Sequence, residues 1–139
     1  VATGDYTHIA VAVGTGATFR GMAASAGSNQ RVWGFLALKG SPDTALRDIC
    51  RETGERTAII TDYSFGGFAR ATPGLLTFMQ EFRKNHGVLL DFVYTAKMMY
   101  GITMMGIGGL LGPMNRVLAV HTGGLQGNRS LDPSLGLCP

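Results

Sequence analysis

Charged residues are scarce in this chain, making up 15% of its 139 residues against 45% apolar residues. So little charge argues against a coiled coil, and so large an apolar share argues against an intrinsically disordered chain. The net charge of +3 comes from scattered basic residues, with no run longer than Arg83-Lys84. Because a nucleic-acid footprint needs a clustered basic patch, we expect no nucleic-acid partner.

Cysteine and long apolar runs are also lacking. Cys50 and Cys138 lie far apart and neither has a CxxC partner. We therefore expect no disulfide framework and no metal site, and a reducing, cytoplasmic compartment. The longest apolar stretch, Gly101 to Met114, is interrupted by glycines and a proline, so we expect no membrane span. The N-terminus has neither a basic segment nor an initiator Met. We expect no signal peptide there, and a chain that is part of a longer protein.

Glycine, by contrast, is abundant, with 21 residues, or roughly twice its usual share of about 7%. The sequence has no Gly-X-Y period, which excludes collagen. The length suits one ordinary domain with one core. In such a domain, many glycines suggest tight turns and close approach of the backbone to another group.

Strand-like and helix-like segments alternate along the chain. Short apolar, β-rich runs predict strands at His8–Val13, Arg31–Leu38, Thr57–Thr61 and Arg116–Val120. Helical spacing and capping residues predict helices at Ala17–Ala26, Asp43–Glu52, Pro73–His86 and Tyr94–Met105. His8 is expected at the surface or at a sheet edge. The alternation predicts an α/β fold of three layers, with a mostly parallel sheet and helices on both faces.

The loop Gly14-Thr15-Gly16-Ala17-Thr18 joins the first predicted strand to a helix. Glycines let a backbone fold closely around an oxyanion, and free amides at a helix start can then hold it. The loop is neither a Walker A sequence nor a full GxGxxG, so phosphate binding and a plain strand-to-helix turn both remain open.

Two later segments, taken together with this loop, resemble a known family. They are Leu90 to Lys97 (LDFVYTAK) and Val120 to Gly127 (VHTGGLQG). With the first loop, they resemble the GSGGT or GTGGT loop, the LDPVYTGK segment and the HTGG segment of the D-cysteine desulfhydrase and 1-aminocyclopropane-1-carboxylate deaminase family. The order matches and the spacing is similar, from about Thr7 to Gly127. The resemblance implies a pyridoxal-phosphate enzyme of the tryptophan-synthase-β-like fold.

The resemblance also implies a role for each matching residue. The cofactor phosphate would be held by Gly14, Thr15, Gly16, Ala17 and Thr18. Tyr94 would be a catalytic residue over the cofactor, where its phenol could move a proton or orient the substrate. Thr95 and Thr122 would lie near the pyridine nitrogen. Neutral hydroxyls there make the ring a weaker electron sink, which suits elimination from Cβ.

Departures from the family pattern bear on the substrate. Ala17 and Ala96 replace family glycines, and Phe92 replaces a proline beside Tyr94. Phe68 stands where the family usually has a second active-site tyrosine, and cyclopropane ring opening in this family uses both phenols. The implied reaction is therefore β-elimination and deamination of a small amino acid, like that of D-cysteine desulfhydrase, giving a 2-oxo acid and ammonia. Deamination of 1-aminocyclopropane-1-carboxylate is the alternative.

The lysines of the chain are Lys39, Lys84 and Lys97, and none matches the family's Schiff-base lysine. That lysine belongs to an N-terminal portion that this sequence does not contain. We therefore expect residues 1–127 to be the C-terminal part of the cofactor-binding large domain and residues 128–139 to be an irregular tail. The chain alone is expected to be inactive. The family also suggests a homodimer. A non-catalytic phosphate-binding module or a truncated pseudoenzyme is the alternative from another class.

Overall fold

The computed structural model describes residues 4–39 and 44–139. The strands are β1 (His8–Val13), β2 (Arg31–Leu36), β3 (Thr57–Ile60) and β4 (Val117–Val120). The α-helices are α1 (Ala17–Ser25), α2 (Thr44–Thr53), α3 (Pro73–His86) and α4 (Thr95–Ile107). Short 3₁₀ helices are η1 (Gly54–Arg56), η2 (Leu125–Ser130) and η3 (Pro133–Leu135).

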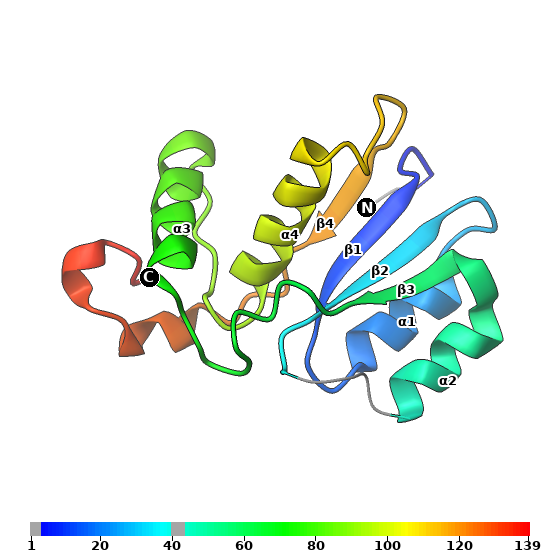
Figure 1. The fold of residues 1–139 in the computed structure, drawn as a ribbon, viewed down its shortest axis with the longest axis horizontal. Coiled ribbons are helices and arrows are strands. Elements are labelled where there is room, and N and C mark those ends of the chain that lie inside the picture. Colours follow the sequence, from blue (N-terminus) through cyan, green and yellow to red (C-terminus); the bar gives the residue numbers. More distant parts are fainter. Residues whose placement is uncertain (1–3, 40–43) are drawn as a thin grey trace.

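The strands form one parallel sheet in the order β3-β2-β1-β4 (Figure 1). In the centre, His8 of β1 is in register with Arg31 of β2 and with Val117 of β4. The continuous apolar run of β1 fits this central place, because a strand of a parallel sheet is covered on both faces. The predicted parallel sheet is confirmed.

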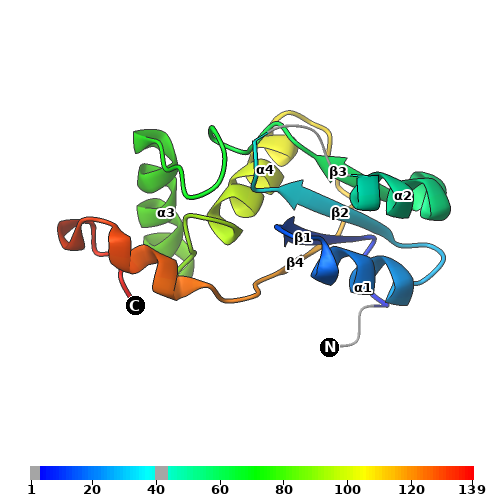
Figure 2. The same cartoon turned by 90° about the horizontal axis from the view of Figure 1, so that it is seen from below.

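Helices cover both faces of the sheet, as expected. Val11 of β1 packs in one core with Phe19 of α1 and Leu46 of α2. On the opposite face, Ala10 of β1 packs in another core with Met98 of α4. Figures 1 and 2 show the sheet between α4 on one side and the pair α1 and α2 on the other. The carboxyl ends of β1 and β4 therefore open between α1 and α4.

A further apolar cluster lies beside the sheet, where α3 and the C-terminal segment meet (Figures 1 and 2). Leu75 of α3 is buried there together with Leu90 and Leu137. Asn128 is fully buried, and its amide donates to the carbonyls of Leu90 and Leu137, at 2.8 Å each. The expected irregular tail is therefore partly wrong, since η2 and η3 form within it and it closes this cluster.

The predicted element bounds agree closely with the structure, with a few differences. β2 ends at Leu36, and α4 continues to Ile107. The predicted helix start at Asp43 lies outside the described residues. His8 is not a surface residue: it is 6% exposed, and its ring centroid lies 4.2 Å from that of Trp33.

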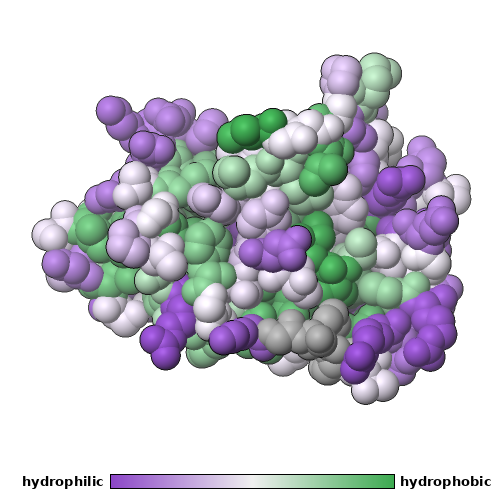
Figure 3. Space-filling model, in the orientation of Figure 1, coloured by the Kyte–Doolittle hydropathy of each residue, from purple (hydrophilic) through white to green (hydrophobic). Residues whose placement is uncertain are grey.

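Large apolar side chains reach the surface at the C-terminal end of α4 and in the loop after it. These residues are Met104, Ile107, Leu110 and Met114. Figure 3 shows apolar surface (green) among polar groups on this side of the molecule. Within residues 4–39 and 44–139, none of the helices is both long enough and apolar enough to cross a bilayer.

Candidate functional site

The Gly14 loop leaves the sheet at the end of β1 and enters α1 at Ala17. Gly16 caps α1 with a φ of 89°, and a Cβ there would lie 2.5 Å from Leu46 Cδ2. Both the backbone angle and the packing therefore require glycine at this position. The first turn of α1 contains no acidic residue. Its first amides have no intrahelical acceptor, so this helix start can receive an anion.

The loop meets the segment after β4 at the carboxyl edge of the sheet. Val11 is in register with Val120, the last residue of β4, so Thr122 follows just beyond the carboxyl end of that strand, beside the end of β1. A cleft of about 220 Å³ opens there, lined by Ala12, Gly14, Thr15, Thr18, Tyr94 and Thr122. Ligands of open α/β sheets bind outside the carboxyl ends of the strands, so this is where a ligand is expected.

Tyr94 lines the cleft next to the loop. Its ring lies so close to Gly14 that a Cβ there would be 3.1 Å from Tyr94 Cε1 and 3.3 Å from Tyr94 Oη. Phe68 stands edge-on to this ring, with the two centroids 6.1 Å apart, and is 58% exposed. Phe68, the residue at the family's second tyrosine position, therefore does lie beside Tyr94.

Asp91 fixes the backbone at Tyr94. Its buried carboxylate accepts hydrogen bonds from the amides of Val93, Tyr94 and Thr95 at 2.8–3.0 Å. These amides belong to the turn that leads into α4 and to its first residue, so Asp91 caps this turn, while Tyr94 itself is the N-cap residue of the helix. Helix α4 begins where this carboxylate turns the chain, and Tyr94 is held at its edge.

The structure does not bring Thr95 to the cleft. Thr95 is fully buried, and its hydroxyl donates to Asp91 Oδ2 at 2.8 Å and accepts from the Asp91 amide at 2.9 Å. Gly16 and Ala17 are not among the residues that line the cleft either. Gly16 is buried, and Ala17 is exposed on α1. Ala12 also lines the cleft, and no motif selects it, because its place follows only from the end of β1.

His121 connects the second and third motifs. Its Nδ1 accepts from the Gly123 amide at 3.1 Å, and its Nε2 lies 2.9 Å from the Leu89 carbonyl oxygen. These partners require the neutral tautomer with the proton on Nε2. Gly124, with a φ of 85°, packs its backbone against the Asp91 carboxylate. The Thr122 loop and the Tyr94 segment are therefore built as one unit.

Lys97, at the end of the second motif, is 1% exposed. Burial lowers its pKa to about 8, an effect that the nearby Asp91 carboxylate partly offsets. Its amino group donates to the backbone carbonyls of Ala37 and Gly67. Lys97 is therefore engaged with the framework and is not among the residues that line the cleft.

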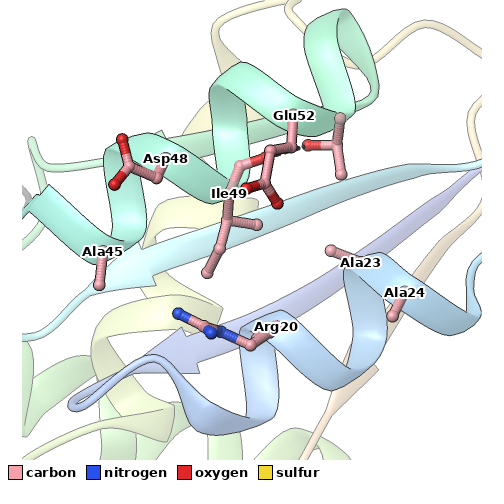
Figure 4. Close-up of a pocket in the computed structure, with 8 residues that line it drawn as sticks. Arg20, Ala23, Ala24, Ala45, Asp48, Ile49 and Glu52 are labelled. Atoms are coloured by element: carbon pink, nitrogen blue, oxygen red, sulfur yellow. Dashed lines mark hydrogen bonds between the residues drawn. The ribbon is translucent and has the colours of Figure 1, made fainter.

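A larger cavity of about 320 Å³ lies between α1 and α2, away from the three motifs. Figure 4 shows it lined by Arg20 from α1 and by Asp48 and Glu52 from α2, around alanines and Ile49. The Asp48 carboxylate already pairs with Arg51, at 3.0 Å. Among the residues that the structure describes, no group of three His, Cys, Asp or Glu side chains is placed to hold a metal ion.

Fold and cleft together define a class: an α/β domain that presents a glycine- and threonine-rich loop and a tyrosine at the carboxyl edge of a parallel sheet. No family model matches the chain. One solved structure, titled "Crystal Structure Analysis of the ACC deaminase homologue", superposes with a TM-score of 0.80 at 27% identity. The superposition covers 96% of this chain and 44% of that chain.

Curated relatives carry the same name. The chain is 30% identical over 129 residues to the "Putative 1-aminocyclopropane-1-carboxylate deaminase" of Pyrococcus abyssi, and 28% identical over 136 residues to that of Pyrococcus furiosus. These matches cover 84% and 88% of this chain, but 38% and 41% of the relatives. The chain belongs to the family of 1-aminocyclopropane-1-carboxylate deaminase homologues, and it spans about two fifths of the length of the relatives it matches.

Proposed function

We propose that this chain is the C-terminal part of the cofactor-binding domain of a pyridoxal-phosphate enzyme that acts on a small amino acid. One observation carries the proposal. Gly14, Tyr94 and Thr122 come from three distant parts of the chain and line one cleft. A plain strand-to-helix turn would not require the other two residues to be there.

The residues of the cleft suit the two ends of the cofactor. At the loop end, the hydroxyls of Thr15 and Thr18 and the first amides of α1 would hold the phosphate. At the other end, Thr122 would offer a neutral hydroxyl to the pyridine nitrogen. When bound, the cofactor supplies an electron sink for charge that develops at the substrate Cα.

Tyr94 is the residue we assign to proton movement. Its phenol lies against Gly14, next to the place proposed for the cofactor, and Asp91 fixes its backbone. A phenol held in this way can give a proton to, or take one from, a group within hydrogen-bond reach. The half-buried ring also covers one wall of the cleft and so restricts the entry of water.

For the substrate, we favour β-elimination and deamination of the D-cysteine desulfhydrase kind. The specific support is Phe68, which stands beside Tyr94 and has no hydroxyl. A reaction that needs two phenols at this place lacks one of them. Deamination of 1-aminocyclopropane-1-carboxylate is the second candidate, supported by the names of the relatives.

The Schiff-base lysine would come from outside this chain, because Lys97 is bound to backbone carbonyls and Lys39 and Lys84 are not part of the cleft. We propose that an N-terminal portion of the same fold supplies it, and that the complete enzyme is a homodimer. A non-catalytic phosphate-binding module would have the same loop but would not need Tyr94 at this place.

Cofactor binding can be tested on this chain with pyridoxine 5′-phosphate, which has an alcohol in place of the aldehyde and forms no lysine adduct. We expect NMR shifts at the amides of Gly14 to Phe19 and at Thr122. Thr18→Val should weaken binding about tenfold through the loss of one hydrogen bond to a charged group. Thr77→Val, at an exposed position of α3, is the matched control and should leave the binding of pyridoxine 5′-phosphate unchanged. Shifts confined to the loop would support the phosphate module, and no shift in either motif would reject both readings.

A test of the substrate requires a longer form of the protein that contains both this chain and the family's Schiff-base lysine. We expect activity with D-cysteine, and a gain of activity with 1-aminocyclopropane-1-carboxylate when Phe68→Tyr restores the second phenol. Activity of the unchanged form with the cyclopropane substrate alone would reject the preferred substrate but not the cofactor.

A further inference from the structure

The loop that carries Phe68 is held in an unfavourable backbone conformation. Among the described residues, the non-glycine residues with positive φ are Phe65 (53°) and Ala69 (51°), both in this loop. Gly66 and Gly67, between them, have φ values of 88° and 116°. L-residues in this region cost conformational energy and persist only where surrounding contacts enforce them. The contacts that enforce this loop therefore decide where Phe68 stands.

Packing holds the first part of the loop. The Tyr63 ring lies on Gly101 of α4, where a Cβ would be 2.7 Å from Tyr63 Cδ2. Phe65 stands edge-on to Tyr100 of the same helix, with the centroids 4.9 Å apart. These contacts precede the glycines. Within the loop, the carbonyl of Gly67, the residue before Phe68, accepts a long hydrogen bond from the Arg70 amide at 3.3 Å, which does not join it to the rest of the fold.

Lys97 joins the Gly67 carbonyl to the rest of the fold. Its Nζ donates to the Gly67 carbonyl oxygen at 2.5 Å and to the Ala37 carbonyl oxygen, just after β2, at 3.3 Å. On its other side, the Gly67 backbone lies against Lys39, where a Cβ would be 3.0 Å from Lys39 Cβ. The amino group thus joins the loop to the end of a central strand.

A buried amino group is costly unless it is fully hydrogen-bonded, so an apolar side chain would be the cheaper way to fill this space. The lowered pKa of Lys97 reflects the same cost. Tyr94 and Lys97 lie at the start of the same helix, α4, and Phe68 follows Gly67 directly. Helix α4, which begins beside Tyr94, therefore also carries the lysine that fixes the position of Phe68 beside Tyr94.

We propose that Lys97 is a positioning residue that clamps the Gly67 carbonyl and so holds Phe68 against Tyr94, which lines the cleft. Its importance for specificity rests on the proposed function, because Phe68 is the residue that we connect to the choice of substrate. The clamp itself requires no cofactor and can be measured on this chain alone.

The test compares Lys97→Met, which keeps a long side chain but loses the amino group, with Lys84→Met at an exposed position of α3. We expect amide hydrogen exchange at Ser64 to Arg70 to rise about tenfold or more in Lys97→Met, while the amides of β1 and β2 stay protected. The NOE between the rings of Phe68 and Tyr94 should weaken. Lys84→Met should change neither measurement.

Two results would overturn the clamp: a folded Lys97→Met chain with unchanged loop exchange and ring NOE, or an increase spread evenly over sheet and loop. If Lys97→Met fails to fold, the wild-type chain still decides the matter. A scalar coupling from Lys97 ¹⁵Nζ to the Gly67 carbonyl carbon is expected, and its absence would refute the bond. Failure of pyridoxine 5′-phosphate to bind would reject the proposed function without affecting either measurement.

Discussion

The two glycines of the loop at the end of β1 should respond to alanine in different ways. Gly16 has a φ of 89°, and a Cβ there would meet Leu46 Cδ2 at 2.5 Å. Gly14 is not among the glycines with positive φ, and the three atoms nearest to a Cβ there all belong to the Tyr94 side chain, at 3.1–3.5 Å. Gly16→Ala therefore strains the framework, whereas Gly14→Ala displaces the tyrosine of the cleft.

The magnitudes follow from these contacts. A left-handed conformation costs an L-residue roughly 1–2 kcal/mol, and overpacking a core adds about 1–3 kcal/mol. We therefore expect Gly16→Ala to lower the free energy of unfolding by about 2–5 kcal/mol. For a domain of this size, that is a fall in Tm of roughly 10 °C. Gly14→Ala should cost less than about 1 kcal/mol, because the ring can give by a few tenths of an ångström.

Thermal unfolding measures the first effect, and the NMR shifts of the Tyr94 ring protons measure the second. Gly74→Ala is the control, since a Cβ at this exposed helix position meets nothing within 4 Å. It should be neutral or slightly stabilising. The reasoning fails if Gly14→Ala melts as low as Gly16→Ala, or if it leaves the Tyr94 ring shifts where they are in the wild type.

Two further predictions concern buried polar groups. Asp91→Ala removes the acceptor of three amides and of the Thr95 hydroxyl, so the free energy of unfolding in urea should fall by about 3 kcal/mol or more. Asp91→Asn should fall between this variant and the wild type, and equal stability of all three would contradict the cap. Burial, and then the charge of Arg31, lower the pKa of His8, so the unfolded chain binds the proton more tightly. Stability from neutral His8 is therefore complete above the unfolded pKa of about 6.5 and is lost as the pH falls through that value toward the folded pKa. Urea unfolding between pH 7.5 and 5 should show this loss, and His8→Phe, which keeps the packing on Trp33, should flatten the slope.

Much of the fold could be predicted because its signals are local. The run from His8 to Val13 is apolar at every residue but the first, which is typical of a strand covered on both faces. Pro73 and Gly87 mark the start and the end of α3, where their fixed or permissive φ values suit those places. The cleft was predictable for a similar reason, since Gly14 and Thr122 follow strands whose carboxyl ends meet at one edge of a parallel sheet.

What could not be predicted depends on contacts between distant residues. His8 is buried because Trp33, on the neighbouring strand, covers its ring, and no pattern along one strand reports such a neighbour. The segment after Gly127 is polar and contains prolines, which suggests an irregular tail. Yet the amide of Asn128 reaches two carbonyls that lie far apart in the sequence, and this one side chain fixes the segment.

Thr95 shows why adjacent motif residues need not share a role. Tyr94 and Thr95 are neighbours in the motif, and both were expected at the cofactor. Asp91 caps the turn that leads into α4, and its carboxylate offers the Thr95 hydroxyl a partner four residues away. A buried hydroxyl so close to a buried acceptor pairs with it, because a buried polar group without a partner is costly. The cap thus holds Thr95 in the buried framework and leaves Tyr94 at the start of the helix. Of the two threonines expected at the pyridine nitrogen, Thr122 lines the cleft and Thr95 does not.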